Sequence, residues 1–284
     1  ISGLAGVVAG VVAIDGKTAC GSRDGHNTAL HTISAYATAS GLCLGQEHTR
    51  GKGNEIPAIK ALLDTLALKG CIVTIDAIGC QTEIARKILD RGGDYLLAVK
   101  DNQKDLADAL REFFADGEPR GFGSLPVSRF QSLEKAHGRI ETRQAMWVTN
   151  LSWLDKKLRE HWPKLAGLGM IERQREINGA VSTERAYYIG SQGIKSAESF
   201  AKAARDHWGI ENSLHWVLDI TFREDDCRVR KDHAPHNFAA LRKFALALLR
   251  KDTQFPKRSL RSRRKTAERL PDYRASLRGL SSPS

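Results

Sequence analysis

The stretch CIVTIDAIGCQTEIARKILDRGGDYLLAVK, residues 71–100, places a helical segment between two apolar runs. The first run, CIVTID, is short and only its last residue is charged, which is typical of a buried strand that ends in an acid. The segment QTEIARKILDRGG has helical periodicity, and YLLAVK again has the composition of a strand. This order predicts a strand, a helix and a second strand.

Further strands and helices extend the pattern on both sides. Strand-like runs lie at residues 7–15, 29–37 and 42–49, and a Ser-Gly pair between the last two is typical of a hairpin turn. Apolar residues repeat at helical spacing over residues 54–70, and another helix is predicted near 104–115. A three-strand meander followed by helix, strand, helix and strand is the element order of the ribonuclease H-like fold. By that analogy we expect an α/β fold, with a mixed sheet flanked by helices and the first strand in its interior. The strand at residues 71–76 should run parallel beside the first strand, reached by a right-handed crossover.

Composition divides the chain into four parts. Residues 1–116 would hold the first part of the core. The Gly- and Pro-rich segment DGEPRGFGSLP then begins a region of β-like patterns, so residues 117–195 are predicted to form a β-rich insertion. Helical patterns return over residues 196–250, which would complete the core, and residues 251–284 form a basic tail. The tail has ten Lys or Arg against three Asp or Glu, which favours a polyanionic partner or a solvated, mobile segment.

The overall composition excludes several classes of protein. With 41% hydrophobic and 27% charged residues, most of the 284 residues should fold, and no apolar stretch is long enough to span a membrane. The apolar opening segment lacks a basic n-region, so it is interpreted as a first strand and not as a signal peptide. The five cysteines form no CxxC pair and no zinc-type cluster, which indicates buried or incidental thiols in a reducing cytosol.

Three acidic residues lie in separate short motifs: Asp15 in VVAIDGK, Asp76 in CIVTIDAIGCQ and Glu211 in RDHWGIENSLHW. The first two end predicted neighbouring strands, whereas Glu211 lies in a segment with helical periodicity. Three carboxylates on separate elements are what a pair of Mg²⁺ ions requires, because this ion prefers oxygen ligands. In a chain with a net charge of +11, the pattern predicts phosphoryl transfer on nucleic acid. Simpler interpretations stay open: Asp15 could open a turn, and Asp76 could cap the following helix.

Longer motifs occur along the chain in the order VVAIDGKT, TIDAIGCQ, LLAVKDNQ, HGRIETR and HWGIENSLHWVLDITFRED. In the order of these motifs and in the residues around them, the chain resembles DDE-type insertion-sequence transposases, in particular the branch that includes the H-repeat-associated proteins. The resemblance covers essentially the whole chain. It implies a ribonuclease H-like domain with an insertion before the last catalytic helix, and metal-dependent cleavage and strand transfer at the ends of a mobile element. Asp15, Asp76 and Glu211 match the three catalytic, metal-binding acids of that family.

The same resemblance implies a cofactor, partners and a location. Two Mg²⁺ ions, with Mn²⁺ as a substitute, would bind the acids. The partners would be element ends and target DNA, with no membrane partner, and a homodimer is expected by analogy with synapsis. The protein would act in a bacterial-type cytoplasm, associated with the nucleoid when bound to DNA. Members of the branch carry a helical region before the first strand, and this sequence starts at Ile1 without one, so we expect an N-terminal truncation.

The surroundings of the third acid depart from many related transposases. Those proteins often place a tyrosine, an arginine and a lysine at fixed offsets from the glutamate. The corresponding places here hold Ala204, His207 and Leu218. Three other acids follow closely and keep the choice of the third acid open: Asp219, Asp225 and Asp226. Because the HWGIEN form matches the nearer branch, Glu211 is retained as the predicted third acid.

A further set of residues near the motifs is predicted to contact DNA: Lys17, Lys100, Asn102, Gln103, His137, Arg139, Arg143, His207 and Trp208. A lysine can bind phosphate as a point charge, amides can reach sugar or base edges, and an aromatic ring can stack on an extruded base.

These contacts have simpler alternatives. The loop after YLLAVK could be an ordinary polar loop, and Trp208 and Trp216 would more commonly pack in a core. Strand alternation puts Arg139, Glu141 and Arg143 on one face, which could grip DNA or be the solvated side of a sheet.

A zinc site is a weaker interpretation of the helical motif. His207, Glu211 and His215 would share one helix face, but HxxxExxxH is not the HExxH arrangement of zinc enzymes. We expect these histidines to contact DNA or to hydrogen-bond acids.

Three hypotheses for the function follow. The leading one is a metal-dependent DNA transposase or a fragment of one. The second is a catalytically silent DNA-binding remnant of a transposase, and the third is a ribonuclease H-like nuclease. Intact acids favour an enzyme, but the sequence does not separate these three.

Overall fold

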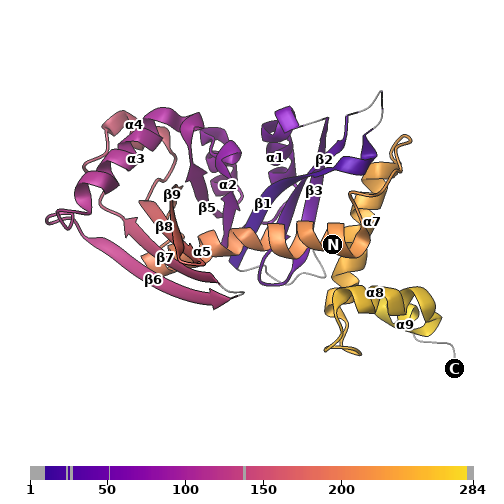
Figure 1. Ribbon diagram of the computed structural model, residues 1–284. Helices are drawn as coiled ribbons and strands as arrows, with labels where there is room; N and C mark the ends of the chain where they lie inside the picture. Colours follow the sequence, from indigo (N-terminus) through magenta and orange to yellow (C-terminus); the bar gives the residue numbers. More distant parts are fainter. Residues whose placement is uncertain (1–9, 24, 26–27, 51, 137–138, 280–284) are drawn as a thin grey trace.

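The computed structural model describes residues 10–23, 25, 28–50, 52–136 and 139–279, and it shows a mixed sheet with helices on both faces (Figure 1). Within these residues the strands are β1 (Gly10–Ala19), β2 (Leu30–Ala37), β3 (Leu42–Arg50), β4 (Cys71–Ile75), β5 (Asp94–Val99), β6 (Val127–Ala136), β7 (Arg139–Val148), β8 (Gly167–Ile177) and β9 (Ala180–Gly190). The helices are α1 (Glu55–Asp64), α2 (Thr82–Asp90), α3 (Lys104–Gly117), α4 (Lys156–His161), α5 (Ala197–Gly209), α6 (Trp216–Phe222), α7 (Ala234–Lys251), α8 (Leu260–Arg269) and α9 (Pro271–Leu277). Over the described ranges, no helix has the length and apolar composition that crossing a membrane requires.

The strand order confirms the predicted ribonuclease H-like core. The sheet runs β3-β2-β1-β4-β5-β9-β8-β7-β6, so β1 lies in its interior. β1 pairs antiparallel with β2 and parallel with β4, and β4 pairs parallel with β5. The meander and the crossover therefore occur as expected from the order of elements. Residues 7–9 of the first predicted strand lie outside the described residues.

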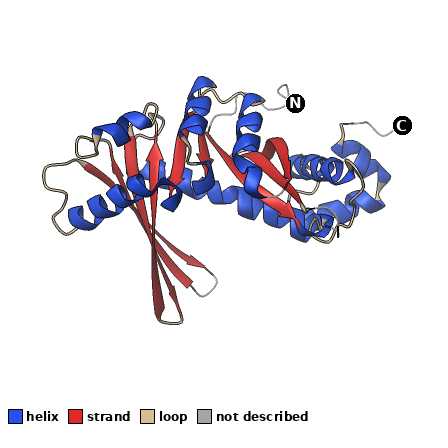
Figure 2. Cartoon of the chain, turned by 90° about the horizontal axis from the view of Figure 1, so that it is seen from above, coloured by secondary structure: helices blue, strands red, loops and turns tan. Residues whose placement is uncertain are grey.

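The predicted β-rich insertion continues the same sheet. β6 to β9 form an antiparallel meander, and β9 pairs antiparallel with β5, with Leu96 opposite Gly190. The long strands of this meander extend beyond the helices that cover the sheet (Figure 2). We retain residues 117–195 as a proposed insertion, built onto the edge of the core sheet that β5 would otherwise form.

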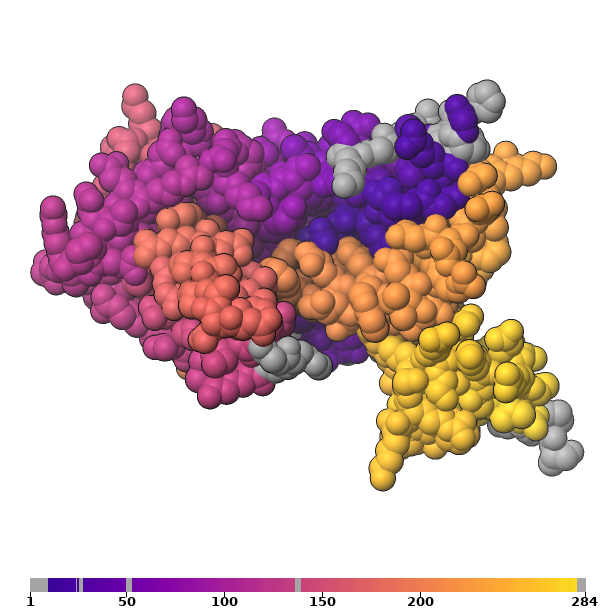
Figure 3. Space-filling model, viewed as in Figure 1, coloured from indigo at the N-terminus to yellow at the C-terminus, as the bar shows by residue number. Residues whose placement is uncertain are grey.

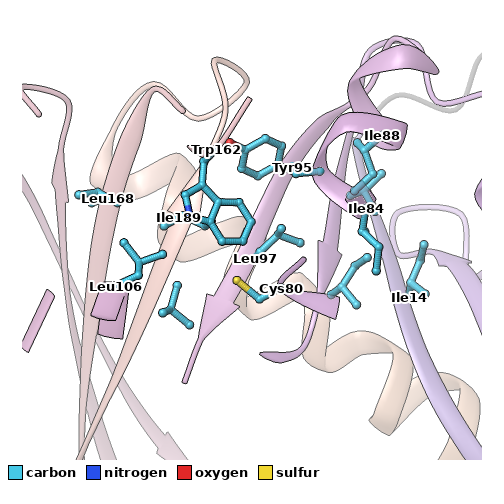
Figure 4. Close-up of a cluster of buried hydrophobic side chains, with 14 of the residues drawn as sticks. Ile14, Cys80, Ile84, Ile88, Tyr95, Leu97, Leu106, Trp162, Leu168 and Ile189 are labelled. Carbon is cyan, nitrogen blue, oxygen red and sulfur yellow. The ribbon is translucent and has the colours of Figure 1, made fainter. Parts of the chain in front are cut away.

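Strand alternation divides the core between the two faces of the sheet. Ile14 on β1 packs in a cluster with residues of α1, α2 and α3, part of which Figure 4 shows around Ile14 and Ile84. Val11, on the alternate side of β1, packs in a second cluster with Phe200 of α5. Each fully buried aliphatic side chain stabilises the fold by about 1.5–3 kcal/mol, so these clusters hold the sheet firmly between two helical layers. The same alternation directs Asp15 to the α5 face.

The basic segment at residues 252–279 forms α8 and α9, which stand out from the rest of the molecule (Figure 3). Arg263 on α8 is buried and donates a hydrogen bond to the Leu249 carbonyl oxygen at 2.8 Å. Tyr273 on α9 donates one to Asp252 Oδ2 at 2.7 Å. A mobile segment was one of the two alternatives for this tail; over these residues it is helical, and these two side chains make contacts that a count of charges does not reveal.

Histidine packing between β3 and α7 predicts a loss of stability in acid. The ring of His48 stacks on that of His236 with centroids 4.3 Å apart. Burial, with smaller contributions from His236 and Lys243, lowers the pKa of His48 to about 4. A histidine whose pKa is lowered by folding stabilises the protein above its unfolded pKa of 6.5, and this contribution is lost as the pH falls toward 4.

We expect the free energy of unfolding to fall by on the order of 2 kcal/mol over this pH range because of His48, which is only half-buried. Urea denaturation at a series of pH values measures the loss. In a His48→Gln variant the loss should be smaller, and an equal loss in both proteins would assign the acid sensitivity to other groups.

Candidate active site

Asp15 and Asp76 lie side by side in the middle of the sheet. β1 and β4 pair in parallel up to Ile14 and Ile75, so Asp76 is the first residue beyond β4 and lies next to Asp15. The sequence predicted Asp15 at the end of its strand, but β1 continues beyond it and pairs with β2 as far as Ala19. Val11 on β1 and Thr74 on β4 face α5, and Asp15 and Asp76 lie an even number of residues after them, so the acids face α5 as well. The two carboxylates therefore share one face of the sheet.

Glu211 lies over this face in a helical rod formed by α5, the π-helical segment η5 (Ile210–His215) and α6. Two histidines join the rod to the sheet. The Nδ1 atom of His207 lies 3.0 Å from Thr74 Oγ1, and that of His215 lies 3.5 Å from Asp15 Oδ2. Glu211 is four residues from each histidine, so it lies between the attachments to β4 and β1. π-Helical turns are rare and frequently occur at functional sites.

The electrostatics of Asp15 reflect this convergence. Burial raises the pKa of Asp15 to about 7, and the nearby charges of Asp76, Glu211 and Glu55 raise it as well, whereas the hydrogen bond from the Gly16 N–H lowers it. Carboxylates that repel one another favour a cation among them, and oxygen donors suit Mg²⁺ and Mn²⁺. No group of three His, Cys, Asp or Glu within the described ranges already has a metal-binding arrangement. The donor set therefore fits a divalent ion, although the side chains would have to move together to share one.

The simpler roles considered for these acids are not seen. Asp76 precedes a short turn, but its side chain makes no capping hydrogen bond, and α2 begins after Gln81 without a side-chain cap. Asp15 lies within β1, not at a turn. Glu211 is exposed and lines a cavity of about 400 Å³ together with Asp76.

The other candidates for the third acid are engaged elsewhere. Lys17 Nζ lies 2.8 Å from Asp219 Oδ1 and 3.1 Å from Asp225 Oδ1. Asp226 pairs with an exposed arginine at 2.8 Å. These pairs favour Glu211 as the third acid. They also argue against the predicted DNA contact of Lys17, because its side chain is only 11% exposed and its charge is neutralised within the protein.

The residues after β5 divide between two roles. Asn102 and Gln103 donate side-chain hydrogen bonds, at 2.6 and 2.9 Å, to carbonyl oxygens of the turn that follows Asp76. They therefore support the position of this acid. Lys100 is exposed and lines the cavity that contains Asp76 and Glu211, where a phosphate could reach it.

The two tryptophans of the rod are not core residues. Trp208 is 38% exposed and Trp216 is 59% exposed, so the expectation of core packing was wrong for both. The guanidinium carbon of Arg173 lies 4.5 Å from the centre of the Trp208 ring. The histidines that flank Glu211 contact β1 and β4, and the described residues contain no zinc-type cluster. His137 lies outside the described residues.

Arg139 and Arg143 converge on Glu141, which is only 2% exposed. Arg173 and Arg175 of β8 approach the same carboxylate at 3.6 and 3.1 Å. The sequence analysis did not select these two β8 residues. Their signal was present, because the charged residues of RQR in β8 alternate with a neutral one, as do those of RIETR in β7.

The sequence analysis also did not predict a histidine–glutamate pair on the side of β1 opposite to Asp15. His31 Nε2 on β2 lies 2.7 Å from Glu55 Oε1, at the start of α1. The ring of His31 lies so close to β1 that a Cβ atom at Gly16 would be 2.6 Å from it, which explains the glycine after Asp15. A lone histidine in a strand of apolar and small hydroxyl residues was the available signal.

Comparison with known proteins identifies similar chains. A family model described as "Transposase DDE domain" matches residues 8–248. The chain is 41% identical over 245 residues to "Putative transposase YncI" of Escherichia coli O157:H7, which covers 84% of this chain and 62% of that protein. It is 39% identical over 273 residues to "H repeat-associated putative transposase YhhI" of Escherichia coli strain K12, which covers 94% of this chain and 71% of that protein.

One solved structure is also similar. A cryo-EM structure of the piggyBac transposase synaptic complex with hairpin DNA matches with a TM-score of 0.44 and 11% identity. The match covers 96% of this chain and 49% of that one.

Proposed function

Because the chain belongs to the transposase DDE domain family, we propose that it is a DNA transposase that catalyses metal-dependent cleavage and strand transfer at insertion-element ends. The observation that supports this proposal is the convergence of Asp15, Asp76 and Glu211, from three separate elements, on one face of the sheet. The chain spans 62% of the length of one relative and 71% of another, so the activity of those longer proteins is part of the proposal.

In this proposal the three acids would hold two Mg²⁺ ions, for which Mn²⁺ would substitute. The bound ions would activate an attacking water or 3′ hydroxyl and stabilise the leaving oxygen. The ring of His215 lies 3.5 Å from Asp15, and Asn102 donates a hydrogen bond to the turn after Asp76. Lys100, exposed beside the acids, would bind a neighbouring phosphate as a point charge.

The proposed partners are the element end and the target DNA, bound by a homodimer in the cytoplasm. A net charge of +11 supports a polyanionic partner, because basic residues that neutralise phosphates release counterions.

A plasmid-nicking assay tests the enzymatic part of the proposal. The purified chain is incubated with supercoiled plasmid and Mg²⁺ or Mn²⁺, beside Asp76→Asn and the control Asp90→Asn. Asp90 is an exposed acid on α2 that does not line the cavity with Glu211. We expect nicking that depends on the metal, is lost in Asp76→Asn and persists in Asp90→Asn.

Other outcomes identify the competing hypotheses. DNA binding without nicking under any condition would indicate a catalytically silent remnant. Nicking without joined products, in the presence of a DNA end that carries the terminal repeat, would indicate a nuclease. Nicking that persists in Asp76→Asn would contradict the proposed site.

A further inference from the structure

The α5 face of the sheet carries a second polar groove beside the acids. It is a groove of about 800 Å³ between the β6–β8 strands and the rod, and we call it the arginine groove. Its basic lining residues are Arg139, Arg143, Arg173, Arg175, Lys202 and Arg205. Four acidic residues also line it, so the groove retains an excess of basic side chains.

A single buried carboxylate organises the arginines on the strands. Glu141 lies directly opposite Arg175 in the sheet, and Arg143 lies directly opposite Arg173. Like charges directly opposite one another on neighbouring strands destabilise a sheet. Glu141 contacts Arg143 and lies within 3.6 Å of the other two guanidinium groups, so it offsets their repulsion. Although burial raises its pKa, the arginines hold the pKa of Glu141 below its usual range, so it stays ionised.

The arrangement leaves guanidinium groups available to a ligand. Arg143 also pairs with Glu134 at 3.1 Å and Arg173 with Glu184 at 3.4 Å, but these carboxylates cannot accept all the hydrogen bonds that four guanidinium groups donate. Arg139 is 47% exposed and Arg175 is 34% exposed. The planar donor fork of arginine matches the oxygens of a phosphate better than an ammonium group does.

The groove is continuous with the acids. Arg173 and Trp208 line both the arginine groove and the cavity that contains Asp76 and Glu211. The arginines, the acids and the rod also share one face of the sheet, since the β7 residues that follow Arg143 on this face pack against α5. A DNA strand held at the acids could therefore extend along the arginines without crossing the sheet.

We propose that the arginine groove binds the phosphate backbone of DNA next to the catalytic acids, and that Glu141 is a positioning residue that holds the arginines in place. The choice of DNA as the ligand rests on the proposed function. Glu141 contributes no donor to phosphate, and its charge opposes that of DNA. Its expected effect on binding comes from ordering the guanidinium groups, which reduces the cost of fixing them in the complex.

The test measures the affinity for a fluorescent duplex of random sequence at several salt concentrations. Arg175→Gln should weaken binding roughly three- to tenfold and reduce the slope of log affinity against log salt by about 0.9, the value for one lost phosphate contact. Arg86→Gln is the matched control, because Arg86 is an exposed arginine on α2 outside the groove. The control should bind with an unchanged slope.

Glu141→Gln separates positioning from simple electrostatics. The substitution removes one negative charge, so electrostatics alone predicts tighter binding, whereas disordered arginines should give roughly fivefold weaker binding and a smaller salt slope. Equal or tighter binding by a variant with a native melting temperature would overturn the positioning role. If this variant does not fold, an unchanged salt slope in Arg175→Gln would by itself overturn the proposal.

The outcome is distinguishable from failure of the proposed function. Nicking that depends on Asp76, combined with DNA binding that is unchanged in the Arg175 and Glu141 variants, would support the transposase proposal and overturn the DNA-binding role of the groove. Absent nicking, combined with weaker binding in these variants, would support the groove and contradict the transposase activity.

Discussion

Replacing Glu211 with Gln is expected to reduce metal-dependent plasmid nicking by more than about 100-fold. Losing an outer-shell partner of a metal ligand usually costs up to about 100-fold, and the loss of a direct ligand should cost more. The amide keeps the size of the side chain but supplies no negative charge to a metal shared with Asp15 and Asp76. Because Glu211 is exposed at the cavity, the substitution should leave the melting temperature nearly unchanged. Initial nicking rates at saturating DNA and Mn²⁺ measure the effect.

The matched control is Asp226→Asn, fifteen residues further along the chain. Asp226 forms a surface pair with Arg223, and exposed pairs of this kind contribute about 0–1 kcal/mol. This variant should nick plasmid at the wild-type rate. Full activity in Glu211→Gln, with loss of activity in Asp226→Asn, would transfer the role of third acid and contradict the assignment from geometry.

The central sheet could be predicted because its signals are local. The apolar runs and the helices between them supply the order of elements, and the analogy with the ribonuclease H-like fold then places β1 beside β4 and Asp15 next to Asp76, as the structure has them. The helical spacing around Glu211 was also readable, but its position over β1 depends on long-range packing, since Ile210 and Leu214 of η5 are buried in one cluster with Ala13 of β1. Family resemblance, not periodicity, selected Glu211 from the acids that follow it.

The parts that sequence analysis did not predict depend on long-range contacts. Nothing in the neighbourhood of Leu96 indicates that it pairs with Gly190, so the attachment of the insertion to the core sheet had no local signal. The composition of the motif VVAIDGK made Lys17 a candidate for DNA binding, whereas its acidic partner Asp219 follows it by about two hundred residues. Charge alone does not distinguish a lysine that meets a phosphate from one that is neutralised inside the fold.

Replacing Asp15 with Asn is expected to stabilise the metal-free chain while removing its response to Mn²⁺. Asp15 is largely buried near the charges of Asp76 and Glu211, and a neutral amide of the same shape relieves this repulsion. Its oxygen can still accept the hydrogen bond from the Gly16 N–H. Substitutions that relieve such functional strain commonly stabilise a protein by about 0.5–2 kcal/mol.

The wild-type chain should instead be stabilised by the ion. A ligand at one hundred times its Kd stabilises the folded state by about 2.7 kcal/mol, which raises the melting temperature by several degrees. Melting curves at neutral pH, with Mn²⁺ and with a chelator, measure both effects, and Asp226→Asn serves as the control that should keep the wild-type response. An Asp15→Asn variant that melts below the wild type with chelator would show that Asp15 does not repel its neighbours, and one that keeps the full Mn²⁺ shift would show that Asp15 does not bind the ion. Stabilisation without metal, together with a lost metal response, is the combination that a carboxylate held ready for a cation should produce, because a purely structural acid would lower the melting temperature when removed.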